Sequence, residues 1–443
     1  MVASMTESRS ILLVTSNGFG MGHLVRQLAI AAQLPADVRC TIMTLSQAAP
    51  VAVRGGAVLE YCPSYTSPWL TKRMWHRGYL RDRIVALAEE VDADVVAFDG
   101  VVPYAGLLAA LRRLPVAAVW VRRGVWRVDA TTSPLAFADL FDLIIEPGDL
   151  GDGMDAGATH KRGDARKVGV ITQAGPHSML DRAQAAAVLG VDPDRPTVLF
   201  NVGSNAIAGL DAIMARLAER EDLNFVTTKD ALGRNRSGAQ GARIRTVTGV
   251  FPLHPYLAAV DLAVTSVGYN AAHEFTACAV PTVLVPADNV TDDQRARALA
   301  MQAQGVGVAV EASSPDTLAR VVEGLIDDEL ARAQMASNAR ELQRHWGDGA
   351  LETAAMLLKL RPHTKPDLIP LVRLRARLLA EWLLGFRDRR PALAGVVITE
   401  DLLSVDLAGQ TAVEHVHPGL SADYRDRRTV IAETWYGRRP TQG

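Results

Sequence analysis

Residues 11–23 read ILLVTSNGFGMGH, which is an apolar run, a glycine-rich turn and the start of a segment with helical spacing. The apolar run is continuous rather than alternating, as is typical of a parallel strand that is buried on both faces of its sheet. Residues 262–274, LAVTSVGYNAAHE, repeat this order of strand, glycine turn and helix start. The two stretches predict two doubly wound α/β domains, each with its ligand site beyond the carboxyl ends of the strands.

Further apolar runs of strand length alternate with helical segments around both stretches. They lie at 38–44, 94–99, 116–121 and 143–146 in the first half, and at 197–202, 223–228, 244–248, 282–285 and 306–310 in the second. Between the halves, residues 147–167 are rich in Gly, Asp and basic residues and have the composition of a linker. We therefore expect an α/β protein with Rossmann-like domains at 1–165 and 166–361, facing each other across a cleft.

The overall composition excludes several classes of protein. The 443 residues are 49% hydrophobic and 22% charged, as in an ordinary globular protein, which excludes general disorder. With 47 Lys and Arg against 49 Asp and Glu, the formal charge is −2, so nucleic acid is not expected as a partner. Three cysteines without metal-ligand spacing, no signal peptide and no membrane-spanning apolar run predict a cytoplasmic protein.

Residues 362–443 do not continue the α/β pattern, and they form a C-terminal extension to which the sequence assigns no role. Leu371, Leu374, Leu378, Trp382 and Phe386 recur at helical spacing, with basic residues elsewhere on the same helix. A basic amphipathic helix can lie on an anionic membrane, which would make the protein peripheral at the inner face of the cell membrane. The alternative is that the apolar stripe packs on the chain's own domains.

The glycine turn at 17–23 suits a bound anion but does not match the dinucleotide fingerprint. Gly20 and Gly22 let the backbone approach a ligand, and the helix that follows favours negative charge at its N-terminus. His23 stands where the third glycine of G-x-G-x-x-G would fall, and residues 44–46 hold no acidic residue for a ribose. A dehydrogenase is therefore the weakest alternative.

The turn around Gly268 carries the more specific pattern. It follows a strand that ends at Ser266 and opens a helix, so it too suits phosphate oxygens. Glu274 lies six residues after Gly268, where a carboxylate can accept hydrogen bonds from a vicinal diol such as a ribose. The alternative for Glu274 is a solvated position on the helix surface.

Residues 268–294 resemble the donor-binding signature of the GT-B glycosyltransferases, which include the UDP-glycosyltransferases and the family 28-type peptidoglycan N-acetylglucosaminyltransferases. The pattern G-[YW]-N-x-x-x-E ends at Glu274, prolines follow at 281 and 286, and Asp293-Gln294 closes the stretch. The turn that ends at His23 and the segments 202–205 and 249–252 resemble loops of the same superfamily. Ser266 and Arg297 depart from the pattern, because a His and an Asn are common at these positions.

The resemblance implies an inverting glycosyltransferase that takes its sugar from a nucleotide-sugar, expected to be a UDP-sugar. Two D-x-D sequences, Asp92-Ala93-Asp94 and Asp192-Pro193-Asp194, imitate the metal-binding motif of another glycosyltransferase fold, but both precede strands instead of following them, so no metal or other cofactor is expected. The resemblance implies His23 as the general base and Asp99 as the carboxylate that orients it, unless Asp99 is only a turn residue. Diphosphate, ribose, nucleobase and sugar would contact Gly20, Gly22, Ser204, Asn205, Phe251, Ser266, Gly268, Tyr269, Asn270, Glu274, Asp293 and Gln294. Thr291-x-x-Gln294 is also a capping box, which leaves a helix-capping role open for Gln294.

Arg122, Arg123 and Trp126 follow the strand 116–121 and should face the cleft from the first domain. Arginines beside a tryptophan suit an anionic or lipid-linked acceptor, and the alternative is a solvated basic loop. Two other functions stay open. One is a sugar-nucleotide 2-epimerase on the same fold, and the other is a non-catalytic sugar-nucleotide-binding protein.

Overall fold

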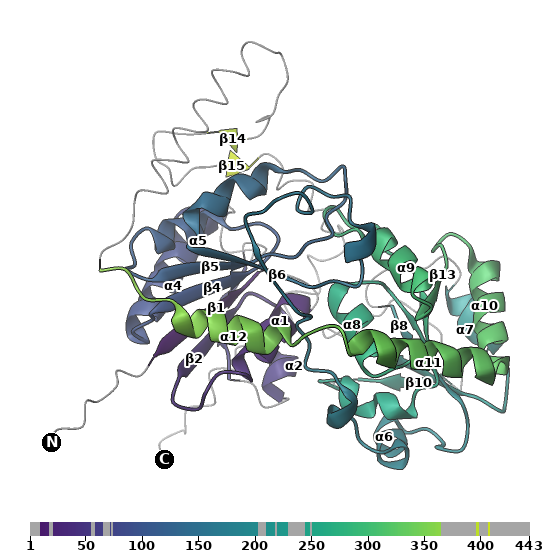
Figure 1. Cartoon of the computed structure of the whole chain (residues 1–443). Coiled ribbons are helices and arrows are strands. Elements are labelled where there is room, and N and C mark those ends of the chain that lie inside the picture. The colour runs from purple at the N-terminus through teal and green to yellow at the C-terminus, as the bar shows by residue number, and fades with distance from the viewer. Residues whose placement is uncertain are drawn as a thin grey trace, which may run out of the picture.

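The structure is a computed structural model, and it contains two parallel sheets with helices on both faces (Figure 1). It describes residues 9–16, 21–54, 58–64, 71, 74–202, 210–217, 219–228, 244–248 and 250–364, and the two-residue strands β14 (Val396–Val397) and β15 (Asp406–Leu407). The amphipathic segment expected at 371–386 lies outside these residues. No helix in the described part of the chain is both long enough and apolar enough to span a membrane.

Within the described residues, the first sheet holds seven parallel strands in the order β3-β2-β1-β4-β5-β6-β7. They are β1 (Ser10–Thr15), β2 (Arg39–Thr44), β3 (Glu60–Tyr61), β4 (Val95–Asp99), β5 (Ala117–Val121), β6 (Leu143–Pro147) and β7 (Arg166–Val168). Ile11 and Leu13 enter one apolar layer, whereas Leu12 and Val14 enter the opposite layer. The continuous apolar run of β1 is thus explained by burial on both faces, as predicted.

Helices cover both faces of this first sheet (Figure 1). One face packs on α1 (Gly22–Ala31), α2 (Ala49–Arg54) and α12 (Gly349–Lys359). The other face packs on α4 (Leu80–Glu90), which continues a π-helical turn at Trp75–Tyr79, and on α5 (Ala105–Leu111). Because α1 follows β1 directly, its N-terminus lies at the carboxyl edge of the sheet.

The described part of the second sheet has six parallel strands in the order β10-β9-β8-β11-β12-β13. Its strands are β8 (Thr197–Asn201), β9 (Asn224–Thr228), β10 (Ile244–Val247), β11 (Leu262–Thr265), β12 (Thr282–Leu284) and β13 (Gly307–Ala309). Its helices are α6 (Arg182–Leu189), α7 (Leu210–Leu217), α8 (Tyr269–Ala277), α9 (Gln294–Ala303), α10 (Pro315–Asp327) and α11 (Glu329–Gln343).

The two doubly wound domains are confirmed, but their boundary differs from the expected division at 165–166. β7 begins at Arg166 and pairs with β6, so the first sheet ends inside the expected second domain. α12 also returns to the first domain, where Ala354 and Leu357 join the apolar layer of Ile11. β7 was not predicted because two of its three residues are exposed and basic, which leaves no apolar run in the sequence.

Candidate functional site

Several of the predicted residues lie at the carboxyl edges of both sheets, where the two domains meet. His23 lies in the first turn of α1, after β1, and Asp99 is the last residue of the neighbouring strand β4. Gly268 immediately precedes α8, which follows β11 in the second sheet. The expected positions Gly20, Ser204 and Asn205 lie outside the described residues.

His23 and Asp99 form a hydrogen-bonded pair. The Nδ1 atom of the imidazole lies 2.6 Å from Oδ1 of Asp99. The Asp99 side chain is fully buried, whereas 20% of the His23 side chain is exposed. The strand register places Asp99 beside Thr15, so the carboxylate reaches the turn between β1 and α1. This geometry fits an imidazole oriented through Nδ1, with Nε2 left for a substrate.

Arg26 also contacts Asp99, and the sequence reading missed this residue. Its Nε donates to Oδ2 of Asp99 at 2.9 Å, and its Nη2 donates to Oδ1 at 2.5 Å. Its spacing of three residues from His23 places both on one face of α1, and this spacing was the available signal. The site is therefore a cluster of imidazole, carboxylate and guanidinium rather than a pair.

Burial and charge decide which groups in this cluster are ionised. Burial lowers the pKa of His23 and outweighs the favourable Asp99 carboxylate, and the charges of Arg26 and Arg123 lower it further. Burial opposes ionisation of Asp99, but the Arg26 and His23 charges outweigh it and hold the pKa of the carboxyl below its usual value. At neutral pH the imidazole is thus neutral and the carboxylate is charged, which is the state a general base requires.

The start of α8 contacts the start of α1. Nδ2 of Asn270 donates to the carbonyl oxygen of Gly22 at 2.9 Å. A Cβ atom on Gly268 would meet no atom within 4 Å, so the backbone there is open to a ligand. Gly22 and the start of α8 therefore lie together, and His23 is the next residue in the first turn of α1.

The side chain of Tyr269 is buried and engaged elsewhere, so its expected role in donor binding stays a prediction for its backbone amide at the start of α8. Its ring is buried, and its hydroxyl accepts a hydrogen bond from the Ile171 amide at 3.1 Å. The same hydroxyl donates to the carbonyl oxygen of Gly148 at 3.0 Å. Tyr269 thus ties α8 to Gly148, which follows β6, and to Ile171, which follows β7. The sequence pattern identifies the aromatic residue at position 269, but it does not show which distant residues surround the side chain in the fold.

Glu274 lies one turn and a half further along α8 and remains accessible. Its side chain is 23% exposed, and Oε1 lies 3.8 Å from Nδ1 of His254. Burial raises the pKa of the Glu274 carboxyl to about 7. Ser266, just beyond β11, is half-buried at the same sheet edge, and Phe251 packs against the apolar layer of the first domain. A role for these residues in nucleotide binding stays a prediction.

The loop after β5 forms part of the domain interface instead of an acceptor site. The Arg127 amide donates to the Thr291 carbonyl at 2.7 Å, and the Asp293 amide donates to the Val125 carbonyl at 2.9 Å. Trp126 is 2% exposed, and its Nε1 donates to the Arg123 carbonyl at 2.9 Å. Trp126 and Asp292 thus form an isolated β-bridge, which joins the two domains through backbone atoms.

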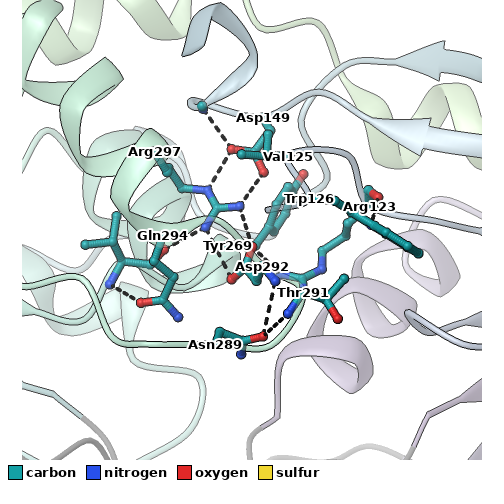
Figure 2. Close-up of polar contacts among 12 residues, drawn as sticks. Arg123, Val125, Trp126, Asp149, Tyr269, Asn289, Thr291, Asp292, Gln294 and Arg297 are labelled. Carbon is teal, nitrogen blue, oxygen red and sulfur yellow. Dashed lines mark hydrogen bonds and ion pairs between the residues drawn. The ribbon is translucent and has the colours of Figure 1, made fainter. Parts of the chain in front are cut away.

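A buried network of ion pairs reinforces the bridge, as Figure 2 shows. Nε and Nη2 of Arg297 each donate to one oxygen of Asp149 at 2.7 Å. Nη2 of Arg297 also donates to Oδ1 of Asp292 at 2.8 Å, and Nη1 donates to the Val267 carbonyl at 2.7 Å. Nη1 of Arg123 lies 3.4 Å from Oδ1 of Asp292. Because Asp149 follows β6 and Arg297 lies on α9, the network connects the two domains.

The expected acceptor residues Arg122, Arg123 and Trp126 are therefore corrected to structural positions. Arg122 is fully buried, and its guanidinium donates to both carboxylate oxygens of Asp164, at 2.7 and 3.2 Å. Arg123 and Trp126 belong to the interface just described. The sequence suggested a binding patch because the acidic partners of these arginines are distant in the chain and could not be recognised.

Asp293 and Gln294 line a cavity of about 500 Å³ between the domains. Oε1 of Gln294 accepts hydrogen bonds from the amides of Val267 and Ala287, at 3.2 and 3.0 Å. Asp293 is the N-cap of α9, and its side chain accepts from the Ala296 amide, so a capping box beginning at Thr291 is wrong. The cavity is lined by Arg127, Val128, Asp129, Pro286, Ala287, Asp288, Asp292, Asp293, Gln294 and Arg295.

The second domain matches a known family, and the whole chain resembles known proteins. Residues 227–347 match the glycosyltransferase family 28 C-terminal domain. The UDP-N-acetylglucosamine–N-acetylmuramyl-(pentapeptide) pyrophosphoryl-undecaprenol N-acetylglucosamine transferase of Acetivibrio thermocellus is 28% identical over 175 residues. This alignment covers 37% of this chain and 47% of that protein, about half its length. The protein of the same name from Mycobacterium tuberculosis is 27% identical over 384 residues, which are 80% of this chain and 90% of that protein.

The fold has counterparts among solved structures. The crystal structure of MurG from Acinetobacter baumannii superposes with a TM-score of 0.52 at 15% identity. The superposition covers 79% of this chain and 99% of that chain. This similarity extends over both sheets and supports the arrangement of two facing domains.

Proposed function

We propose that this chain, which belongs to the GT-B glycosyltransferase superfamily, transfers a sugar from a nucleotide-sugar to an acceptor hydroxyl. The observation that carries the proposal is the His23–Asp99 pair at the start of α1, opposite the start of α8. A hydroxyl is a poor nucleophile at neutral pH, and a neutral imidazole in the cleft can take its proton. The donor turn and the base thus lie on opposite domains of one cleft.

The proposed reaction is a single displacement. Nε2 of His23 accepts the hydroxyl proton while the acceptor oxygen attacks the anomeric carbon. The bond from this carbon to the diphosphate oxygen breaks, and the leaving group departs with its electron pair. The sugar is therefore transferred with inversion. The start of α8 presents backbone amides and the positive end of a helix dipole to the diphosphate.

Activity is expected to survive chelation of divalent metals by EDTA, because the leaving diphosphate is stabilised by backbone amides. The two D-x-D sequences do not lie at the cleft: Asp94 precedes β4 and accepts from the Ser10 amide, and Asp192 precedes β8 and accepts from the Asp194 amide. No group of three metal-binding side chains forms within the described ranges. Loss of turnover with EDTA and its recovery with Mg²⁺ or Mn²⁺ would contradict this expectation.

Glu274→Ala is expected to weaken binding of a UDP-sugar by about 1.5–3 kcal/mol, the scale for hydrogen bonds to a charged group. Because the pKa of the Glu274 carboxyl is about 7, the donor affinity should also depend on pH. The ionised carboxylate accepts two ribose hydroxyls, so affinity should rise as the pH increases from 6 to 8, and Glu274→Gln should remove this rise. Calorimetry with UDP-N-acetylglucosamine measures both effects, because the diphosphate diester of that ligand does not titrate in this range. Unchanged affinity in a folded Glu274→Ala variant would remove Glu274 from the site.

We extend the proposal to a UDP-sugar donor and a lipid-linked acceptor, because the relatives are named for transfer from UDP-N-acetylglucosamine to a pyrophosphoryl-undecaprenol acceptor. Such an acceptor would place the protein in the cytoplasm, at the inner face of the membrane. The burial of Arg122 and Trp126 removes the arginine cluster as support for an anionic acceptor. We propose that the cavity lined by Asp293 and Gln294 holds the transferred sugar.

Product analysis tests the proposed function. The protein is incubated with a UDP-sugar and a panel of lipid-linked and soluble acceptors, and the products are separated by mass spectrometry. A glycosylated acceptor with free UDP supports the transferase. An isomerised UDP-sugar without acceptor would favour the 2-epimerase, and donor binding without any product would favour the non-catalytic binding protein.

A further inference from the structure

The Arg26 guanidinium contacts side chains from three different elements. It donates to both oxygens of Asp99 on β4, and its Nη2 lies 2.7 Å from Nδ1 of His23 on α1. Its Cζ lies 5.1 Å from the centre of the Tyr269 ring on α8. The Arg26 side chain is buried, so these contacts are not screened by water.

The proton on the neutral His23 ring can occupy either nitrogen, and the contact with Arg26 affects which nitrogen carries it. Nδ1 can donate to Asp99 or accept from Arg26, but a single nitrogen cannot do both. If Nδ1 accepts from Arg26, Nε2 carries the proton and cannot act as a base. The ionised Asp99 carboxylate can only accept, so the 2.6 Å contact between Nδ1 and Oδ1 is a hydrogen bond only when Nδ1 carries the proton. Nδ1 therefore donates to Asp99, and Nε2 keeps its lone pair.

We propose that Arg26 is a positioning residue that grips the Asp99 carboxylate and offsets its charge, so that His23 stays a neutral base with its proton on Nδ1. This rests on the proposed function for the role of His23 in transfer, but the effect on the imidazole does not. Without Arg26, the buried Asp99 charge would be opposed by Arg123 alone and would favour imidazolium more strongly. An imidazolium cannot accept the acceptor proton.

The charged groups around His23 set the direction of the expected change. Asp99 favours imidazolium, whereas Arg26 and Arg123 oppose it. Tyr269 faces Arg26 from α8 with a hydroxyl whose pKa burial raises, so it stays neutral. The charge of Asp292 also stabilises the charged form of Arg26. Removal of Arg26 alone leaves Arg123 as the opposing cation, and the balance moves toward the protonated ring.

The test is a titration of the His23 ring by NMR, assigned with a His23→Ala variant. In Arg26→Gln, the midpoint of the His23 titration should rise by about one pH unit or more, the scale for an uncompensated charge at this distance. In Arg26→Lys, the charge is retained, so the midpoint should stay near that of the native protein. Arg122→Met removes an equally buried arginine from another ion pair and should leave the His23 midpoint in place.

Turnover adds an independent readout. The acid limb of kcat/KM should move up with the NMR midpoint in Arg26→Gln. Arg26→Lys should lower kcat with little change in the donor KM, because a single ammonium cannot hold both Asp99 oxygens. An unchanged NMR midpoint in folded Arg26→Gln would overturn the proposal. If Arg26→Gln does not fold, full kcat in Arg26→Lys would overturn it. If the NMR midpoint moves but the acid limb of kcat/KM does not, the effect of Arg26 on the imidazole is supported, and the assignment of His23 as the general base is contradicted.

Discussion

Turnover is expected to fall by about 10²–10⁴ when His23 is replaced by alanine, which is the typical contribution of a general base. The affinity for the nucleotide-sugar should stay near its native value, because His23 acts on the acceptor proton. The measurement is kcat with saturating donor, together with the donor dissociation constant from calorimetry. A loss in kcat without a loss in donor affinity identifies a residue that works in the transition state.

His363→Ala provides the matched control. His363 also faces a carboxylate, with Nε2 at 3.1 Å from Asp142, and it is similarly accessible. Asp142 precedes β6, however, so this pair lies at the amino edge of the sheet, away from the cleft. Its loss should leave kcat unchanged. Near-native turnover in His23→Ala would contradict the assignment of the base and favour the non-catalytic binding protein.

Arg297→Met is expected to lower the free energy of unfolding by about 3–5 kcal/mol, because it leaves the Asp149 and Asp292 carboxylates buried without a partner. Since Asp149 belongs to the first domain, the same change should uncouple the domains. Calorimetry should then resolve two unfolding transitions where the native protein shows more cooperative unfolding. The variant tests whether the ion-pair network holds the cleft in its observed arrangement.

Arg216→Ala is the control for this experiment. Arg216 pairs with Glu323 at 2.8 Å, but the arginine side chain is 54% exposed and both partners belong to the second domain. Such an exposed pair contributes about 0–1 kcal/mol, so its loss should change neither the stability nor the coupling strongly. If Arg297→Met costs no more than Arg216→Ala, the buried network does not hold the domains together.

Much of the architecture could be predicted because each strand carries its own signal. β1 and β11 carry apolar residues on both faces, so each appears in the sequence as an uninterrupted apolar run. The turns after them had to lie at carboxyl edges, since parallel strands share their direction. The pairing of His23 with Asp99 followed from the resemblance to known enzymes, and the strand register explains why their side chains can meet.

The arginines were misjudged for one physical reason, which is pairing between residues that are far apart in the chain. Arg122, 42 residues from Asp164, looked like a surface cation. Arg297 stood out only as a departure from a pattern, although it lies 148 residues from the Asp149 carboxylate that it neutralises. No local spacing encodes such partners. β7 was missed for a different reason, because a three-residue strand with basic residues lacks an apolar run.

The sequence by itself determined the two α/β domains, the turns that begin α1 and α8, and the residues around which a donor site could form. Those features depend on periodicity, glycine and helix starts, which are local properties of the chain. Only the tertiary structure decided that Arg26 completes the His23–Asp99 pair and that Arg123 and Arg297 hold the domains together. The reason is electrostatic: whether an arginine meets water, a ligand or a buried carboxylate depends on what the fold brings to it, and the charge alone is the same in each case.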